Sequence, residues 1–98
     1  MGQEEVWYEK NSAFGKAFRT FYEAHMKPTV LDEKTKCLLK VALACVLRCR
    51  HCTEGNIENA LKAGASKDEV REALLMAALE GAGTQLAWNK DFFAKTLG

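Results

Sequence analysis

The feature that most constrains the fold is a nearly apolar run in the middle of the chain. Between Leu38 and Leu47 the only polar side chain is that of Lys40. A helix that is apolar on almost every side must be buried over most of its surface. A chain of 98 residues has a small core and cannot easily cover such a helix alone. We therefore expect the run to form a helix that a second subunit helps to cover.

The rest of the chain lacks strand-like alternation of apolar and polar residues between turn signals. We therefore expect a single small all-α, multi-helix domain over residues 1–98. Periodicity predicts a first helical stretch over about residues 4–25, broken near Asn11 and Gly15. Its apolar residues at helical spacing are expected to form one buried face: Phe14, Ala17, Phe18, Phe21 and Tyr22.

Capping residues predict where the later helices begin and end. Asp32 suits the N-cap of the apolar helix, and Ser66 opens a capping box. Gly64 suits a left-handed C-cap before that box. A turn is predicted at residues 81–83, with Thr84 as the cap of a last helix. The helix before this turn is expected to bury one face: Val70, Ala73, Leu74, Ala77, Ala78 and Gly81.

The charges and the apolar runs exclude several kinds of partner. Fourteen basic and thirteen acidic residues are interspersed, so no clustered basic face is available for nucleic acid. No apolar run is long enough to cross a bilayer, and the N-terminus does not resemble a secretory signal. We expect a cytoplasmic protein with no nucleic-acid partner and no membrane partner.

Four cysteines lie within sixteen residues of each other: Cys37, Cys45, Cys49 and Cys52. Cytoplasmic chains rarely form permanent structural disulfides, so this crowding suggests chemistry or a buried helix. Cys45 lies inside the apolar run and is interpreted as a small core residue. Cys49 and Cys52 are expected at the start of a helix, where free backbone N–H groups stabilise a thiolate. Such a Cys-x-x-Cys pair is typical of thiol–disulfide oxidoreductases.

The residues around the pair are polar, which argues against two buried structural cysteines. Arg48 and Arg50 add positive charge, and His51 adds charge or moves protons. Glu54 is interpreted as a solvated acid in the first turn, with partnering of His51 as an alternative. These neighbours favour a redox pair exposed to solvent.

A metal site is the main chemical alternative. Zinc normally takes four ligands, often as two separated pairs, and only one tight pair is present. Cys37 with the pair and a histidine is the remaining possibility, and it is less favoured. His25 is interpreted instead as a partly exposed histidine at a helix end. We expect no bound metal and no cofactor.

Several motifs together resemble the carboxymuconolactone decarboxylase and alkylhydroperoxidase D family. They are the Cys49–Cys52 motif, the segment 63–66, the following Glu69-Val70, the apolar helix with Gly81, and the upstream segment 31–36. The resemblance covers about residues 20–95. It implies an all-helical fold of the alkylhydroperoxidase D-like type that assembles as a homotrimer or a homohexamer.

The resemblance implies the peroxide-reducing branch of that family, because this branch carries the cysteine pair. In it the second cysteine attacks the peroxide and becomes a sulfenic acid, and the first resolves it to a disulfide. Carried over, Cys52 attacks and Cys49 resolves. His51 matches a histidine that some members carry before the second cysteine. A dithiol electron donor is the implied partner, and a peroxide or disulfide the implied substrate.

Two positions depart from the family pattern. Cys37 stands where the family has a glutamate, and Asn56 stands where it has a histidine. Those two groups relay the proton that activates the attacking thiol, and an amide cannot take a proton near neutral pH. The alternative is therefore a non-catalytic helical oligomer or redox sensor. Decarboxylation of a lactone is least favoured, because nothing specifies a lactone pocket.

Overall fold

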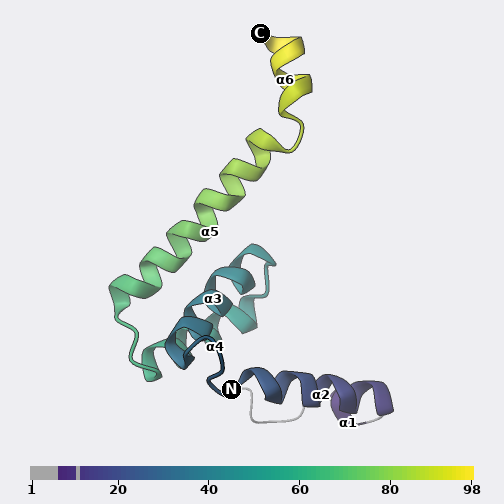
Figure 1. Cartoon of the computed structure of the whole chain (residues 1–98), viewed down its shortest axis with the longest axis vertical. Coiled ribbons are helices and arrows are strands. Elements are labelled where there is room, and N and C mark those ends of the chain that lie inside the picture. The colour runs from purple at the N-terminus through teal and green to yellow at the C-terminus, as the bar shows by residue number, and fades with distance from the viewer. Residues whose placement is uncertain (1–6, 11) are drawn as a thin grey trace.

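The computed structural model describes residues 7–10 and 12–98, and every regular element within them is a helix. The helices are α1 (Trp7–Lys10), α2 (Ala13–His25), α3 (Glu33–Val46), α4 (Arg50–Lys62), α5 (Lys67–Ala87) and α6 (Lys90–Leu97). The predicted all-α fold is confirmed. Figure 1 shows α5 and α6 leading away from the other helices, with α1 and α2 at the opposite end. None of these helices is long and apolar enough to cross a membrane within the described residues.

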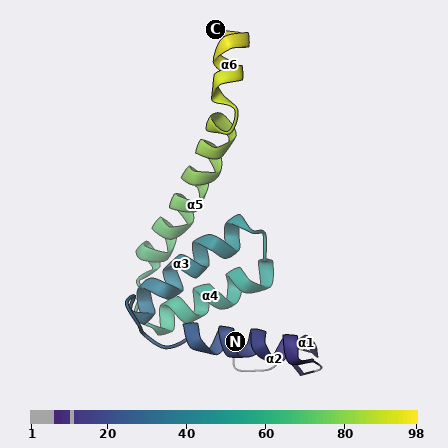
Figure 2. The same ribbon diagram turned by 45° about the vertical axis from the view of Figure 1, so that its right-hand side comes forward.

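The core lies where α3, α4 and the first half of α5 meet. α3 and α4 lie side by side and are joined by a short connection, as Figure 2 shows. Val41 of α3 and Ala60 of α4 are fully buried, and Val70 of α5 closes the cluster. The apolar run is thus a helix, as predicted, and its inner face holds the hairpin together. Partly buried side chains complete this cluster: Cys37, Leu38, Ile57 and Leu74.

The predicted caps at Asp32, Gly64 and Ser66 are confirmed. Asp32 accepts a hydrogen bond at Oδ1 from the backbone N–H of Thr35, at 2.7 Å. Ser66 and Glu69 exchange hydrogen bonds of 3.0 and 2.8 Å between side chain and backbone, which completes the capping box. Gly64 has a φ of 98°, in the left-handed region that only glycine adopts freely. These local signals fix where α3 and α5 begin and where α4 ends.

The predicted turn at residues 81–83 is wrong. α5 continues without a break to Ala87, and Thr84 does not cap a new helix. Its hydroxyl donates a hydrogen bond of 2.7 Å to the carbonyl of Glu80 inside α5. A glycine in a helix interior costs only about 1 kcal/mol, and the alanines and leucines around it favour the helix.

The predicted break in the first helical stretch falls at Ser12. Its side chain accepts a hydrogen bond of 2.9 Å from the N–H of Gly15 and so caps α2. Asn11 and residues 4–6, which the prediction also included, lie outside the described residues. Gly15 is not a break, because it lies inside α2 and is buried. A Cβ atom there would come within 1.9 Å of the carbonyl oxygen of Tyr8, so only glycine lets α1 lie this close.

The predicted buried faces of α2 and of the second half of α5 are exposed in the single chain. Phe14 is 88% exposed and Phe21 is 76% exposed. On α5 burial ends at Ala77, and Ala78 and Gly81 are exposed. The chain has a radius of gyration of 17.3 Å, against about 13 Å for a compact chain of this length. α2 and the second half of α5, here called the outer helices, therefore carry apolar faces that the described part of this one chain leaves uncovered.

Candidate functional site

The turn between α3 and α4 positions the two cysteines of the motif. The backbone N–H of Cys49 donates to the carbonyl of Ala44 at 3.0 Å, and that of Arg48 donates to the carbonyl of Cys45 at 3.2 Å. This pair of bonds is the Schellman pattern that ends a helix in a left-handed residue. Arg48 is that residue, with a φ of 60°. Because the chain reverses here, α4 begins at once and Cys49 is its N-cap.

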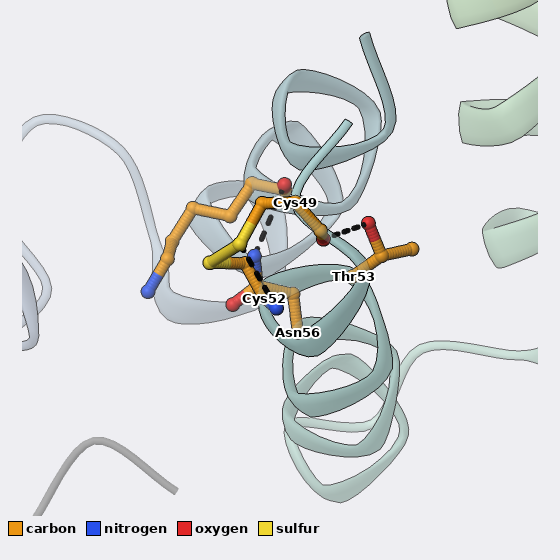
Figure 3. Close-up of a disulfide and its surroundings, with 5 residues drawn as sticks. Cys49, Cys52, Thr53 and Asn56 are labelled. Atoms are coloured by element: carbon orange, nitrogen blue, oxygen red, sulfur yellow. Dashed lines mark hydrogen bonds between the residues drawn. A yellow bond between two sulfur atoms is a disulfide. The ribbon is translucent and has the colours of Figure 1, made fainter. Parts of the chain in front are cut away.

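The sulfur atoms of Cys49 and Cys52 are bonded to each other across the first turn of α4. The S–S distance is 2.08 Å and the Cα atoms are 5.2 Å apart. Figure 3 shows the bond and the backbone N–H of Cys52, which donates to Cys49 Sγ at 3.2 Å. The hydroxyl of Thr53 donates to the carbonyl of Cys49 at 2.8 Å. The start of α4 thus holds the two cysteines at bonding distance.

A hollow of about 310 Å³ lies beside the disulfide. Arg50 and Glu54, predicted as supporting residues, form an ion pair of 3.4 Å there, and both side chains are exposed. Exposed pairs of this kind contribute little to stability because water screens them. His51 is exposed at the same end of α4. The hollow is lined by Cys45, Arg48, Cys49, Arg50, Thr53 and Glu54.

Asn56 has a structural contact at the position where the family has a histidine. Its side chain is 4% exposed, and its Nδ2 donates to the carbonyl of Lys40 at 3.1 Å. Figure 3 shows it further along α4 from Cys52. The amide ties α4 to α3 and has no group that takes a proton near neutral pH. The site therefore holds a hydrogen bond between helices where the family holds a base.

Cys37 does not line the hollow beside the disulfide. It borders a separate cavity of about 200 Å³ with Tyr22, His25 and Lys40. Burial raises the pKa of the Cys37 thiol, and the positive charge of Lys40 opposes this rise. A thiol with a raised pKa is a poor proton acceptor at neutral pH. The structure thus brings together Cys49, Cys52 and Arg50, whereas Cys37 borders another cavity.

His25 matches its sequence interpretation as a partly exposed histidine at a helix end, whereas Cys45 differs from its interpretation. His25 is half-buried, and its Nδ1 meets the carbonyl of Tyr22 while its Nε2 lies 2.7 Å from Lys40 Nζ. Because the carbonyl only accepts, Nδ1 carries the proton and Nε2 accepts from the ammonium. Burial, followed by the nearby lysines, lowers the His25 pKa. Cys45, interpreted as a core residue, is half-buried and borders the hollow beside Cys49.

The four-residue spacing of Cys45 and Cys49 was the signal that could have indicated that both border one hollow. Using that signal requires knowing where the helix ends, because a straight helix and a Schellman turn place residues four apart differently.

The metal alternative has no geometric support among residues 7–10 and 12–98. No three His, Cys, Asp or Glu side chains within them gather as metal ligands do.

Comparison with known proteins identifies the family. A model of the carboxymuconolactone decarboxylase family matches residues 12–90, which is most of the chain. The chain belongs to the carboxymuconolactone decarboxylase family. This confirms the resemblance drawn from the motifs around Cys49 and Ser66.

Two proteins that resemble this chain extend the comparison. A crystal structure of a protein from Methanobacterium thermoautotrophicum superimposes with a TM-score of 0.80 and is 33% identical. The match covers 90% of this chain and 99% of that one. A Paracoccus denitrificans protein described as uncharacterized protein 4 in the cox locus is 40% identical over 57 residues. That match covers 58% of this chain and 51% of the relative, so the chain spans about half of the relative's length.

Proposed function

We propose that this family member is a thiol–disulfide oxidoreductase that reduces peroxides with the Cys49–Cys52 couple. The observation that carries the proposal is the bond between the two sulfur atoms at the first turn of α4. Cys49 of the couple borders an open hollow with two arginines, so the disulfide is reached from solvent. A structural disulfide would more often be sealed inside a core. Family membership supports the same reading, because members of the peroxide-reducing branch carry this cysteine pair.

The reaction follows from thiol chemistry. In the reduced protein a Cys52 thiolate attacks one peroxide oxygen, the O–O bond breaks, and the alcohol or water leaves. Cys52 is then a sulfenic acid. The Cys49 thiolate attacks its sulfur, hydroxide leaves as water, and the disulfide forms. A dithiol donor returns two electrons and two protons and regenerates both thiols.

The N-terminus of α4 favours the thiolate form of the couple. Cys52 lies in the first turn, where backbone N–H groups have no partner in the helix and the dipole is positive. Its own N–H already points at Cys49 Sγ. Arg48 and Arg50 add positive charge around the hollow. The helix and the arginines together stabilise the nucleophile without a base.

Proton transfer is the weak part of this site. The Asn56 amide donates its hydrogen bond to the carbonyl of Lys40, and Cys37 borders another cavity. His51 is exposed and lies next to the attacking cysteine in the sequence, so we assign the proton transfer to it. Loss of positioned acid–base assistance costs on the order of a hundredfold in rate. We therefore propose a slow peroxidase in which His51 assists.

A non-catalytic redox module is the second candidate, and the replaced relay favours it. In that role the couple forms and breaks with the redox state of its surroundings but does not turn over peroxide. The buried Asn56 contact supports it, because the amide joins α4 to α3 and does not act as a base near neutral pH. Peroxide turnover separates the two candidates.

We also propose that the chain acts as a homo-oligomer, a trimer or a hexamer. The apolar side chains on α2, α5 and α6 lie open in the single chain, Phe14 and Leu86 among them. Exposed apolar surface of this extent marks a contact with another protein surface. A second copy of the chain offers the same apolar faces, so self-assembly covers them.

The test measures peroxide consumption with a dithiol as electron donor. Wild type should turn over, and Cys49→Ser and Cys52→Ser should both lose turnover. The two variants differ in a single turnover. Cys49→Ser should still consume one equivalent of peroxide and hold a sulfenic acid at Cys52, which dimedone traps, whereas Cys52→Ser should consume none.

Helical circular dichroism unchanged from wild type serves as the folding control for both variants. Peroxide turnover that survives both substitutions would contradict the peroxidase assignment. A wild-type couple that forms and breaks without consuming peroxide would instead identify the redox module.

A further inference from the structure

Three cysteines, and not only the two of the motif, meet at the end of the α3–α4 hairpin. The hollow of about 310 Å³ is bordered by Cys45 together with Cys49. Cys45 is a free, half-buried thiol in the last turn of α3. The other free thiol, Cys37, borders a different cavity. Cys45 is therefore the free cysteine that shares a solvent-open space with the disulfide.

The turn between the helices keeps Cys45 and Cys49 together. Arg48 in its left-handed conformation reverses the chain, and its N–H donates to the carbonyl of Cys45. The N–H of Cys49 reaches one residue further back, to Ala44. Both cysteines thus belong to one hydrogen-bonded turn. The two side chains also border the same hollow.

We propose that Cys45 is a third redox-active thiol that exchanges with the Cys49–Cys52 disulfide. A Cys45 thiolate attacks Cys49 Sγ, the Cys45–Cys49 bond forms, and the Cys49–Cys52 bond breaks. Cys52 leaves as a thiolate. One disulfide and one thiolate stand on each side, so the step needs no outside oxidant or reductant. Cys49 is the sulfur attacked because it borders the hollow with Cys45, whereas Cys52 does not line it.

This inference rests on the proposed function in one respect, namely that the couple becomes oxidised during turnover. The exchange then frees the attacking thiol before any donor arrives. The oxidised pair becomes Cys45–Cys49, which borders the open hollow where a dithiol donor has access. Cys52 meanwhile is ready for a second peroxide. Cys45 thus separates the place where peroxide is reduced from the place where electrons enter.

The sequence makes this exchange directly measurable. Trypsin cleaves after Lys36, Lys40, Arg48, Arg50 and Lys62, so each cysteine falls on its own peptide. Cys45 lies in residues 41–48, Cys49 in residues 49–50 and Cys52 in residues 51–62. Oxidised protein is quenched with acid, its free thiols are blocked, and the linked peptides are identified by mass. The peptide of residues 37–40, which carries Cys37, should remain unlinked throughout.

Three samples, each oxidised with diamide, decide the proposal. Wild type should contain peptides 41–48 and 49–50 linked, beside the 49–52 disulfide. Cys52→Ser should contain the Cys45–Cys49 linkage as its main product. The matched variant Cys49→Ser should not link Cys45 to Cys52, although it also retains Cys45 and one cysteine of the motif.

Several outcomes would overturn the proposal. They are a wild type with the 49–52 disulfide alone, a Cys52→Ser protein whose Cys45 stays free, or a Cys49→Ser protein that links Cys45 to Cys52. Because diamide oxidises thiols without a peroxidase reaction, the proposed function can fail separately. Exchange in the diamide samples together with no consumption of peroxide would support the role of Cys45 and contradict the peroxidase assignment.

Discussion

The α3–α4 hairpin and the outer helices use their apolar residues in opposite ways. In the hairpin, Val41 and Ala60 are fully buried within the single chain. On the outer helices, Phe14 and Leu86 lie open on the surface. The cysteine couple belongs to the hairpin, whose packing and turn hold it in place. The described part of the chain thus forms the Cys49–Cys52 disulfide internally and leaves the apolar side chains of α2 and of the end of α5 uncovered.

α5 shows this contrast within one helix. Val70 near its start is 6% exposed and packs on the core, whereas Leu86 near its end is 74% exposed. Both halves have the apolar composition of a buried helix. The difference arises because α3 and α4 cover only the first half, as Figure 2 shows. Composition alone therefore reports that a helix face needs cover, but not which chain provides it.

The largest expected effect tests whether another subunit covers the exposed apolar side chains of α5. The double variant Leu75→Gln, Leu79→Gln places two amides on an apolar surface that is open in the single chain. Each leucine removed from a buried interface costs about 2 kcal/mol, so the subunit contact should weaken by about 4 kcal/mol per chain, roughly a thousandfold. Sedimentation or light scattering should show an oligomer for the wild type and single chains for the double variant.

The matched control introduces the same residue at two positions of the helix that are already polar. Glu72→Gln, Glu80→Gln changes two exposed side chains of α5 and should leave the assembly intact. A wild-type protein that is a single chain at all concentrations would contradict the assembly proposal. Equal dissociation by both double variants would show that the apolar character of Leu75 and Leu79 is not the cause.

The sequence predicted the local features of the fold well. The N-caps at Asp32 and Ser66 and the left-handed Gly64 depend on a few neighbouring residues, so a short stretch of sequence determines them. The glycines near residue 81 misled, because a glycine favours a turn only when the flanking residues do not favour a helix. Tertiary contacts determined the rest, including the close approach that makes Gly15 necessary.

The candidate site was predictable in part. The bond between Cys49 and Cys52 follows from their spacing at a helix start. The hydrogen bond from Asn56 to the carbonyl of Lys40 and the separate cavity of Cys37 depend on how α3 and α4 face each other. No spacing rule gives that rotation. The proximity of Cys45 to the couple was missed for the same reason, since it depends on the turn at Arg48.

A smaller effect separates the core of the hairpin from its open face. Val41→Ala removes two methyl groups from a fully buried position, so the free energy of unfolding should fall by about 2 kcal/mol. Val46→Ala makes the same change on the same helix at an exposed position and should cost less than about 0.5 kcal/mol. Both are measured by urea unfolding in the Leu75→Gln, Leu79→Gln background, so that subunit contacts do not contribute. Equal costs would show that the two faces of α3 are not distinct.

The smallest expected effect compares the two thiol environments. The thiolate is the form that alkylating reagents attack, so a raised pKa moves the alkylation curve to higher pH. Burial raises the pKa of Cys37, and its curve should lie above that of a free cysteine, about 8.5. Cys52 in the reduced protein, at the start of α4, should lie below it. Mass spectrometry of the separate tryptic peptides follows both thiols in one sample.

Two controls assign the Cys37 shift to its cause. In denaturant the curves of Cys37 and Cys52 should converge, because the fold that separates them is gone. Lys40→Met should move the Cys37 curve to still higher pH, since the positive charge of Lys40 opposes the effect of burial. A Cys37 that reacts at lower pH than Cys52 would reverse the comparison. Cys37 would then be the activated thiol, and the helix start at Cys49 would have no special effect on its sulfur atoms.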